Sequence, residues 1–560
     1  MQDDAEFDLL ERRIWTLTTL LQNMKHRGTP TSEINEVPPM LRHFTALLSR
    51  GRKEDRTVCA MTGSATPEGV FAMIVAQNSN DDKKDDGKVA VDLLPVKVDP
   101  KRTFEDVVNS GSEVSLTNHI SDILTAMTTI DSMDGQHLDH IGSLSAFIAR
   151  RNFYKLWTRV RQLYKAWDVS VIDEWTPTID DVPNSKWISV PIWLQTVANH
   201  DTPHFCLLSA CEQPDSDILQ WEFSNRTAKA WAGFLTSIIQ HLYNALEKQD
   251  TTIQETGTQD NEVAHKIATC CRFLHSYLEW KEKIVEKLLA ETTMGSVLRS
   301  PTRENIAVGD PELDELEDEL RTIPGESPGA FFLRRLRTIT AWQAAVNFLF
   351  SDYSPARRYR ELARTSPVFV AVVKMPTPSV PTPISKHDLV KEFKRQFPGS
   401  TKILKDLVTV LEEHHPSTLS GTVHAEANLL GLAKYFTAGR CKVKYGIDFK
   451  DEKTFERFAQ PATLDGSIFV EKKCCWCCQR VFKSVGAQLG TSGSGSHGVF
   501  YSWRPPRIGI EVWRLRHLEF ALWRELRDAL AFRLKSPSLP TYVNDDGVVV
   551  NDDDLFAGFD

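Results

Sequence analysis

The side chains best suited to chemistry gather in two short motifs late in the chain. The first is His424-Ala425-Glu426, which sets an imidazole and a carboxylate two residues apart. The second is Cys474-Cys475-Trp476-Cys477-Cys478, which holds four of the ten cysteines in the sequence. Thiolates bind zinc strongly, and CxxC pairs serve metal, structural and redox roles alike. Such crowding of cysteines therefore indicates metal or thiol-redox chemistry.

Together the two motifs contain what a hydrolytic zinc site requires. Such a site takes about three protein ligands and leaves one position for water. His424 and two thiolates would supply the ligands, and Zn²⁺ would lower the pKa of the bound water from about 16 toward about 7. Glu426 would take the proton of that water and return it to the substrate, acting first as general base and then as general acid.

The spacing of the cysteines leaves two possible ligand pairs. Cys474 with Cys477 and Cys475 with Cys478 both have CxxC spacing, which places each pair on one face of a first helical turn. Four thiolates from five consecutive residues are hard to fit around one tetrahedral ion. One pair is therefore expected to bind the metal, and the other to lie beside it.

The order H-x-E followed by C-x-x-C, roughly 50 residues later, matches the zinc deaminase signature. In this region the chain resembles the predicted nucleic acid/nucleotide deaminase family that is expanded in fungi and related to bacterial toxin deaminases. The resemblance covers roughly 100–150 residues and is carried by VHAEANLL (423–430), KKCCWCC (472–478), GSHGVFYSW (495–503) and Pro505-Pro506.

The resemblance implies that His424, Cys475 and Cys478 bind Zn²⁺ and that Glu426 transfers the proton. It favours Cys475 and Cys478 because Cys478-Gln479-Arg480 is similar to the C-R-Q continuation of cytidine deaminases, with the two polar residues exchanged. Cys474 and Cys477 remain the alternative pair. One departure is that Lys473-Cys474 stands where that family usually has a proline before the first cysteine ligand.

The fold class expected is α/β. The resemblance implies a cytidine deaminase-like α/β/α sandwich in the C-terminal part, with zinc between the N-termini of two helices. No hairpin directly precedes His424, where such folds have two strands. The strands could come from a hairpin at Thr57–Gln77, with a helical block inserted between it and the motifs, or one could come from Val368–Met375.

Two further residues are candidates for the rim of the substrate pocket. His497 lies in a glycine- and serine-rich segment, where close approach to a ligand is easy. A solvated linker histidine is the alternative. Trp476 could stack on a base, and a core aromatic is the alternative.

The elements that must position these residues follow from apolar periodicity. Residues 1–100 are predicted to form N-terminal helices and the hairpin, which would join the deaminase sheet if the inserted-block alternative holds. Residues 101–365 are predicted to be a mainly helical domain or insertion, with helices at Leu138–Trp167, Ala228–Leu246, Glu262–Leu289 and Phe331–Phe350 and a polar connection at Thr251–Asp260. Residues 366–540 would form the deaminase-like zinc domain, and 541–560 an acidic tail.

Charge and hydropathy narrow the expected partners. The net charge is −9, yet residues 386–540 contain 25 Lys and Arg against 16 Asp and Glu. This excess favours a nucleotide or single-stranded nucleic acid as partner, although the arginines of 514–527 could simply solvate one helix. The helical region could bind a protein partner. No run approaches the roughly 18–20 apolar residues that a bilayer requires, and the first residues are acidic, so we expect no membrane association and an intracellular location, cytoplasmic or nuclear.

Two other function classes remain open from the sequence. One is a catalytically inactive, deaminase-like interaction or scaffold protein that keeps a structural zinc site. The other is a thiol-redox role for Cys474–Cys478.

Overall fold

The computed structural model divides the chain into two compact units. The sheet unit comprises Met1–Thr45, Thr57–Lys97 and Thr365–Asp560, and the helical unit comprises Ala46–Arg56 and Val98–Arg364. The structure describes residues 2–29, 39–48, 59–65, 71–77, 90–130, 137–182, 184–189, 220–298, 326–351, 356–365, 368–376, 379–437, 442–462, 468–470, 474–489, 496 and 498–534. His497 and the predicted acidic tail at 541–560 therefore lie outside the described residues.

The sheet unit is built on a mixed six-stranded sheet of order β7-β3-β6-β2-β1-β8. Its central strands, β2 (Phe71–Gln77) and β6 (Val368–Lys374), run parallel. Their near-continuous apolar sequences are typical of strands that are covered on both faces. The outer strands are β1 (Cys59–Ala65), β8 (Ile468–Val470), β3 (Ala90–Pro95) and β7 (Asp448–Phe449).

Both strand sources considered from the sequence belong to this one sheet. β1 and β2 form the antiparallel hairpin, with Met61 opposite Val75, and β6 lies beside β2. On its other side β1 pairs antiparallel with β8, the strand that leads into the cysteine motif. The α/β class is thus confirmed, and the helical unit interrupts the sheet unit along the sequence between Lys97 and Thr365.

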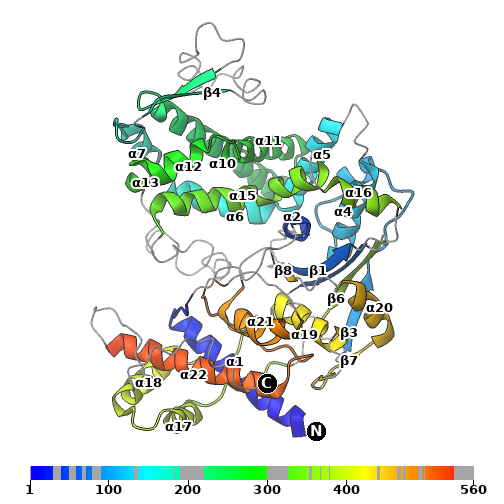
Figure 1. Ribbon diagram of the computed structural model, residues 1–560, viewed down its shortest axis with the longest axis vertical. Helices are drawn as coiled ribbons and strands as arrows, with labels where there is room; N and C mark the ends of the chain where they lie inside the picture. The colour runs from blue at the N-terminus through cyan, green and yellow to red at the C-terminus, as the bar shows by residue number, and fades with distance from the viewer. Residues whose placement is uncertain are drawn as a thin grey trace. The chain divides into compact units, whose positions relative to one another are not determined.

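Helices cover this sheet in successive layers (Figure 1). α19 (Ala425–Thr437) contacts β1, β2 and β8, and α20 (Glu452–Ala462) contacts β1, β2 and β6. α21 (Trp476–Leu489) packs on α19 and on α22 (Val512–Leu534). Beyond them lie α1 (Gln2–Asn23), α17 (Lys386–Gln396) and α18 (Thr401–His414), and α1 packs on α22. A continuous core of buried side chains from α1, the sheet, α19, α21 and α22 joins these layers.

The helical unit contains helices and a short two-stranded sheet, β4 (Lys186–Ser189) with β5 (Gln220–Phe223). The division between the units falls within α2 (Pro39–Leu48). The other helices are α3 (Phe104–Val108), α4 (Leu116–Thr129), α5 (His137–Arg151), α6 (Phe153–Ala166), α7 (Val169–Glu174), α10 (Ala228–Thr256), α11 (Asn261–Leu278), α12 (Ile284–Glu286), the π-helix η1 (Lys287–Glu291), α13 (Met294–Val297), α15 (Pro328–Phe350) and α16 (Arg357–Thr365).

Three predicted ranges in the helical unit differ from the observed elements. The polar stretch from Thr251 belongs to α10 as far as Thr256, because the helix ends only at Gly257, whose left-handed φ of 71° closes it. Asp260 then caps α11 through its side chain. Two of the predicted helical ranges are not continuous helices. Glu262–Leu289 is interrupted between Leu278 and Ile284, where Lys283 has a φ of 51°. Leu138–Trp167 is divided at Asn152 into α5 and α6.

A buried ion-pair network crosses the helical unit. Arg151 on α5 donates to the Asp122 carboxylate on α4 at 2.5 Å, and both side chains are almost fully buried. Burial lowers the pKa of Arg151 to about 10, although the Asp122 charge opposes this. Among the described residues, no helix is long and apolar enough to span a bilayer.

Candidate metal centre

Two helix N-termini meet at the motif residues. His424 directly precedes α19, and its carbonyl oxygen accepts a hydrogen bond from the backbone N–H of Asn428 at 3.0 Å. Cys475 directly precedes α21, and its carbonyl accepts from Gln479 at 3.1 Å. Because α19 and α21 pack on each other, the partial positive charges of both helix ends favour negative side chains at the same place.

Four side chains converge at these helix ends, and we call them the metal centre: His424, Glu426, Cys475 and Cys478. One ligand atom from each lies within 4.8 Å of all the others. His424 Nδ1 is 3.5 Å from Cys478 Sγ and 3.6 Å from Glu426 Oε1. Tetrahedral bonds of about 2.0 Å to nitrogen and about 2.3 Å to sulfur separate ligand atoms by roughly 3.5 Å. The residues present therefore fit a zinc ion.

Cys475 also caps its own helix through its sulfur. The backbone N–H of Cys478 donates to Cys475 Sγ at 3.3 Å. Burial opposes ionisation of this thiol, but that hydrogen bond and the His424 charge outweigh it and lower the pKa of Cys475 to about 6. The CxxC spacing has this result because the third residue of a helix is where an N-cap acceptor finds a donor.

Burial and neighbouring charges shift the pKa values of the remaining ionisable groups of the metal centre. Burial opposes a charged imidazole, yet Cys475 and Glu426 raise the pKa of His424 well above its usual value. Burial likewise opposes the Glu426 carboxylate, but His424 lowers its pKa. For Cys478 burial dominates and raises the thiol pKa. One imidazolium beside two anions leaves a net negative charge in a buried site, which favours a metal cation.

The structure distinguishes the two cysteine pairs. Cys475 and Cys478 lie with His424, whereas Cys474 and Cys477 do not belong to the metal centre. The latter two are about 1% exposed, and burial raises their pKa values well above the usual thiol range.

Of the two predicted rim residues, the structure describes one. Trp476 is only 3% exposed and packs against Phe500, with a ring separation of 4.9 Å, so it is a core residue rather than a rim residue. Its indole fills the space above Gly28, where a Cβ atom would lie 2.3 Å from Trp476 Cδ1. His497 falls outside the described residues.

Two aromatic residues beside the metal centre were not predicted. The indole N–H of Trp503 donates to Cys478 Sγ at 3.1 Å, and the Trp503 side chain is fully buried. Tyr501 presents its ring edge-on to His424 at 5.7 Å. Both lie in the 495–503 motif, which is rich in aromatic residues. Nothing in the spacing of these residues predicts which atoms their side chains contact.

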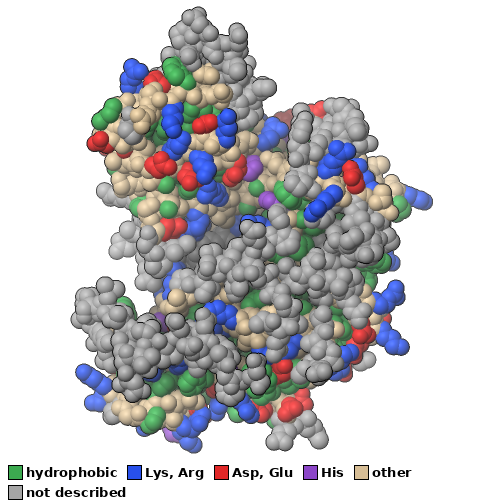
Figure 2. All heavy atoms as spheres, viewed as in Figure 1, with side chains coloured by type: hydrophobic (Ala, Val, Ile, Leu, Met, Phe, Trp, Pro, Cys, Tyr) green, Lys and Arg blue, Asp and Glu red, His purple; other side chains and the backbone are tan. Residues whose placement is uncertain are grey.

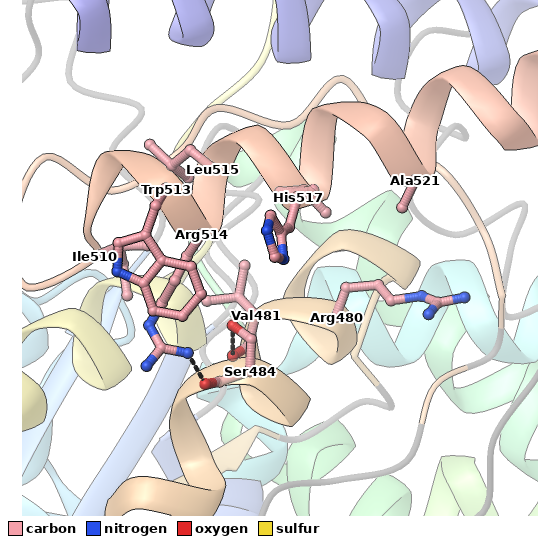
Figure 3. Close-up of a pocket in the computed structure, with 10 residues that line it drawn as sticks. Arg480, Val481, Ser484, Ile510, Trp513, Arg514, Leu515, His517 and Ala521 are labelled. Carbon is pink, nitrogen blue, oxygen red and sulfur yellow. Dashed lines mark hydrogen bonds between the residues drawn. The ribbon is translucent and has the colours of Figure 1, made fainter. Parts of the chain in front are cut away.

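A hollow lies between α21 and α22 and contains no residue of the metal centre (Figure 3). Trp513 and His517 enter it from α22, and Ser484 enters it from α21. Its other lining residues are Arg480, Val481, Ile510, Arg514, Leu515, Leu518 and Ala521.

The arginines of α22 are largely occupied by protein partners. Arg514 lies 4.2 Å from the Trp513 ring centre and binds the Ser484 carbonyl and Glu511. Arg516 pairs with Glu6, and Arg527 pairs with Asp528. Thus Arg514 does not simply solvate the helix, and these three side chains contribute less free positive charge than the sequence indicated.

Comparisons with protein-family models, with curated proteins and with solved structures find no match for this chain.

Proposed function

We propose that this chain is a zinc-dependent hydrolytic deaminase that acts on the amine of a cytosine or adenine base in a nucleotide or nucleic acid. The convergence of His424, Cys475, Cys478 and Glu426 at two helix N-termini carries the proposal. One imidazole and two thiolates complete the ligand set of a catalytic zinc and leave one position open. A structural zinc would not need the carboxylate, and Glu426 Oε1 lies only 3.6 Å from His424 Nδ1.

Bound zinc would supply an activated water for attack on the ring carbon that bears the amine. The net reaction replaces the C–NH₂ group by C=O, consumes one water and releases one ammonia. Glu426 is suited to move the protons because a carboxylate is ionised and able to accept a proton at neutral pH. It would pass the proton first to the ring nitrogen and then to the departing amine.

The surface charge supports a polyanionic substrate. Figure 2 shows Lys and Arg side chains around α17 and α18, where Lys391, Lys394, Lys402 and Lys405 are exposed. A base in a duplex would have to be flipped out, so a free nucleotide, a loop or a single strand is the less demanding substrate.

One observation favours an inactive, deaminase-like interaction or scaffold protein as the second candidate. The side chains of His424 and Glu426 are only 14% and 6% exposed. If Glu426 were itself the fourth ligand, the metal would be closed to substrate, as structural zinc sites are. The two candidates therefore differ in whether Glu426 binds the metal or acts beside it.

A Glu426→Gln variant separates these possibilities. We expect the unaltered chain to carry about one zinc per molecule and to release ammonia from at least one member of a panel of cytosine and adenine nucleotides and oligonucleotides. The variant should keep its zinc, measured by elemental analysis, and lose activity by about 10²–10⁴-fold. Glu456→Gln, on α20, is the matched control and should change neither quantity.

Two results would contradict the deaminase. An unaltered chain that carries zinc but is inactive on the whole panel would favour the scaffold protein, especially if Glu426→Gln weakened zinc binding. Normal turnover in the Glu426→Gln variant would show that Glu426 does not transfer the proton.

A further inference from the structure

The N-terminal helix reaches the metal centre through one short segment, Ser502-Trp503. We propose that α1 is a positioning element of the metal centre, and that Thr18 and Trp503 are positioning residues that set the donor strength of the Cys478 sulfur. This inference rests on the proposed metal site but concerns residues outside the H-x-E and C-x-x-C motifs.

The contact with the metal ligand is made by an indole. Trp503 Nε1–H can only donate, and its partner is Cys478 Sγ at 3.1 Å. In a fully buried site such a bond is costly to lose, because neither group can turn to water. A hydrogen bond to a metal-bound thiolate draws electron density from sulfur and fixes its direction toward the metal.

One face of α1 holds the segment that carries this indole. The Ser502 hydroxyl accepts a hydrogen bond from the Trp15 indole N–H at 2.8 Å and lies 2.6 Å from the Thr19 hydroxyl. The backbone N–H of Ser502 donates to Gln22 Oε1 at 2.7 Å. The backbone N–H of Trp503 donates to the Thr18 hydroxyl at 3.1 Å. Positions 15, 18, 19 and 22 follow helical spacing, so these polar groups form one stripe along the helix.

Toward the start of α1, the same stripe consists of the acidic residues Asp8 and Glu11. Glu11 lies 2.6 Å from Arg504, and both side chains are buried; it also pairs with Arg507 at 2.5 Å. Asp8 pairs with Arg507 at 2.8 Å. These ion pairs fix the residues after Trp503, while the hydrogen bonds of Thr18 and Ser502 fix Trp503 and the residue before it. The indole is therefore held from both sides by a helix 485 residues away in sequence.

Substitution with cobalt tests this inference by a signal that general destabilisation would not produce. The full chain is loaded with Co²⁺, whose thiolate ligands give a sulfur-to-cobalt charge-transfer band. Trp503→Phe keeps the aromatic bulk and removes the N–H, so the sulfur should become a stronger donor but lose its fixed direction toward the metal. We expect the band to move to lower energy and the affinity for Zn²⁺ to fall about 10–100-fold.

Thr18→Val should shift the band in the same direction by a smaller amount, because it loosens the backbone of Trp503 without touching the metal centre. The matched controls are Trp523→Phe and Thr16→Val. Trp523 is a buried tryptophan whose N–H binds Glu519, and Thr16 is a buried threonine of α1 that bonds to Arg12 and Ile384. Both controls should leave the band in place.

The outcomes separate this inference from the proposed function. A normal band and normal zinc affinity in Trp503→Phe and Thr18→Val would overturn the positioning role while leaving the metal site intact. Equal shifts in the controls would also overturn it. If the unaltered chain binds neither Co²⁺ nor Zn²⁺, or binds Co²⁺ without a thiolate band, the proposed metal site itself is wrong. If Trp503→Phe fails to fold, Thr18→Val decides the question.

Discussion

His424 and Cys475 occupy equivalent positions in two different helices. Each is the residue before its helix begins, and each carbonyl oxygen accepts the first hydrogen bond of the helix. A side chain at this position is fixed by the helix backbone rather than by a free loop. The packing of α19 on α21 therefore determines how the imidazole and the thiolate face each other.

The ligand pair can be tested cysteine by cysteine. Cys475→Ala or Cys478→Ala should reduce bound zinc from about one per chain toward zero, because two protein ligands hold zinc weakly. Cys474→Ala and Cys477→Ala, at buried neighbouring positions, should retain it. Elemental analysis of the four purified variants gives the answer, and the reverse pattern would show that the other CxxC pair binds the metal.

A tight approach near the metal centre predicts the effect of a single methyl group. In Gly28→Ala the added Cβ would lie 2.3 Å from Trp476 Cδ1, so the indole or α21 must move. We expect a loss of about 1–3 kcal/mol in the free energy of unfolding. Gly111→Ala is the control, because its Cβ would meet nothing within 4 Å. Urea unfolding of both variants measures this, and equal effects would argue against the close approach.

The buried pair in the helical unit tests whether the two units are separable. Asp122→Ala would leave the buried Arg151 guanidinium without its carboxylate partner, at a cost of about 3–5 kcal/mol in unfolding free energy. Thermal unfolding should show this loss. Zinc content should stay unchanged, since the metal centre belongs to the sheet unit. Loss of zinc from the folded variant would mean that the two units depend on each other.

The stability of the sheet unit should depend on pH through Glu511. Burial opposes its ionisation, but the buried Lys434 of α19 lowers its pKa below the usual 4.5. A carboxyl group with a lowered folded-state pKa adds stability above its unfolded pKa, and this stability is lost as the pH falls through the folded-state value. Glu511→Gln should therefore be less stable at pH 7, and the difference should shrink below pH 4.5. A difference that stays constant between pH 7 and pH 3 in denaturant unfolding would contradict this role.

Local patterns in the sequence were sufficient for much of the scaffold. The alternating and continuous apolar runs predicted the hairpin and the strand at Val368–Met375, and the observed strands are Cys59–Ala65, Phe71–Gln77 and Val368–Lys374. These predictions succeed because backbone propensity and burial of one face act over a few residues. The spacing of His424, Glu426 and the cysteines likewise indicated a group of side chains that could hold a metal ion.

Only the tertiary structure decided which atoms meet. Two overlapping CxxC pairs have the same local spacing. The resemblance favoured Cys475 and Cys478, and the packing of α21 on α19 places this pair beside His424. Trp476 proved to be a core residue because Gly28 and Phe500 surround it. The bond from Trp503 to Cys478, and the hold of α1 on Ser502, join residues that no local pattern connects. Apolar periodicity predicts that one face of an element is buried, but long-range packing alone determines which residues cover that face.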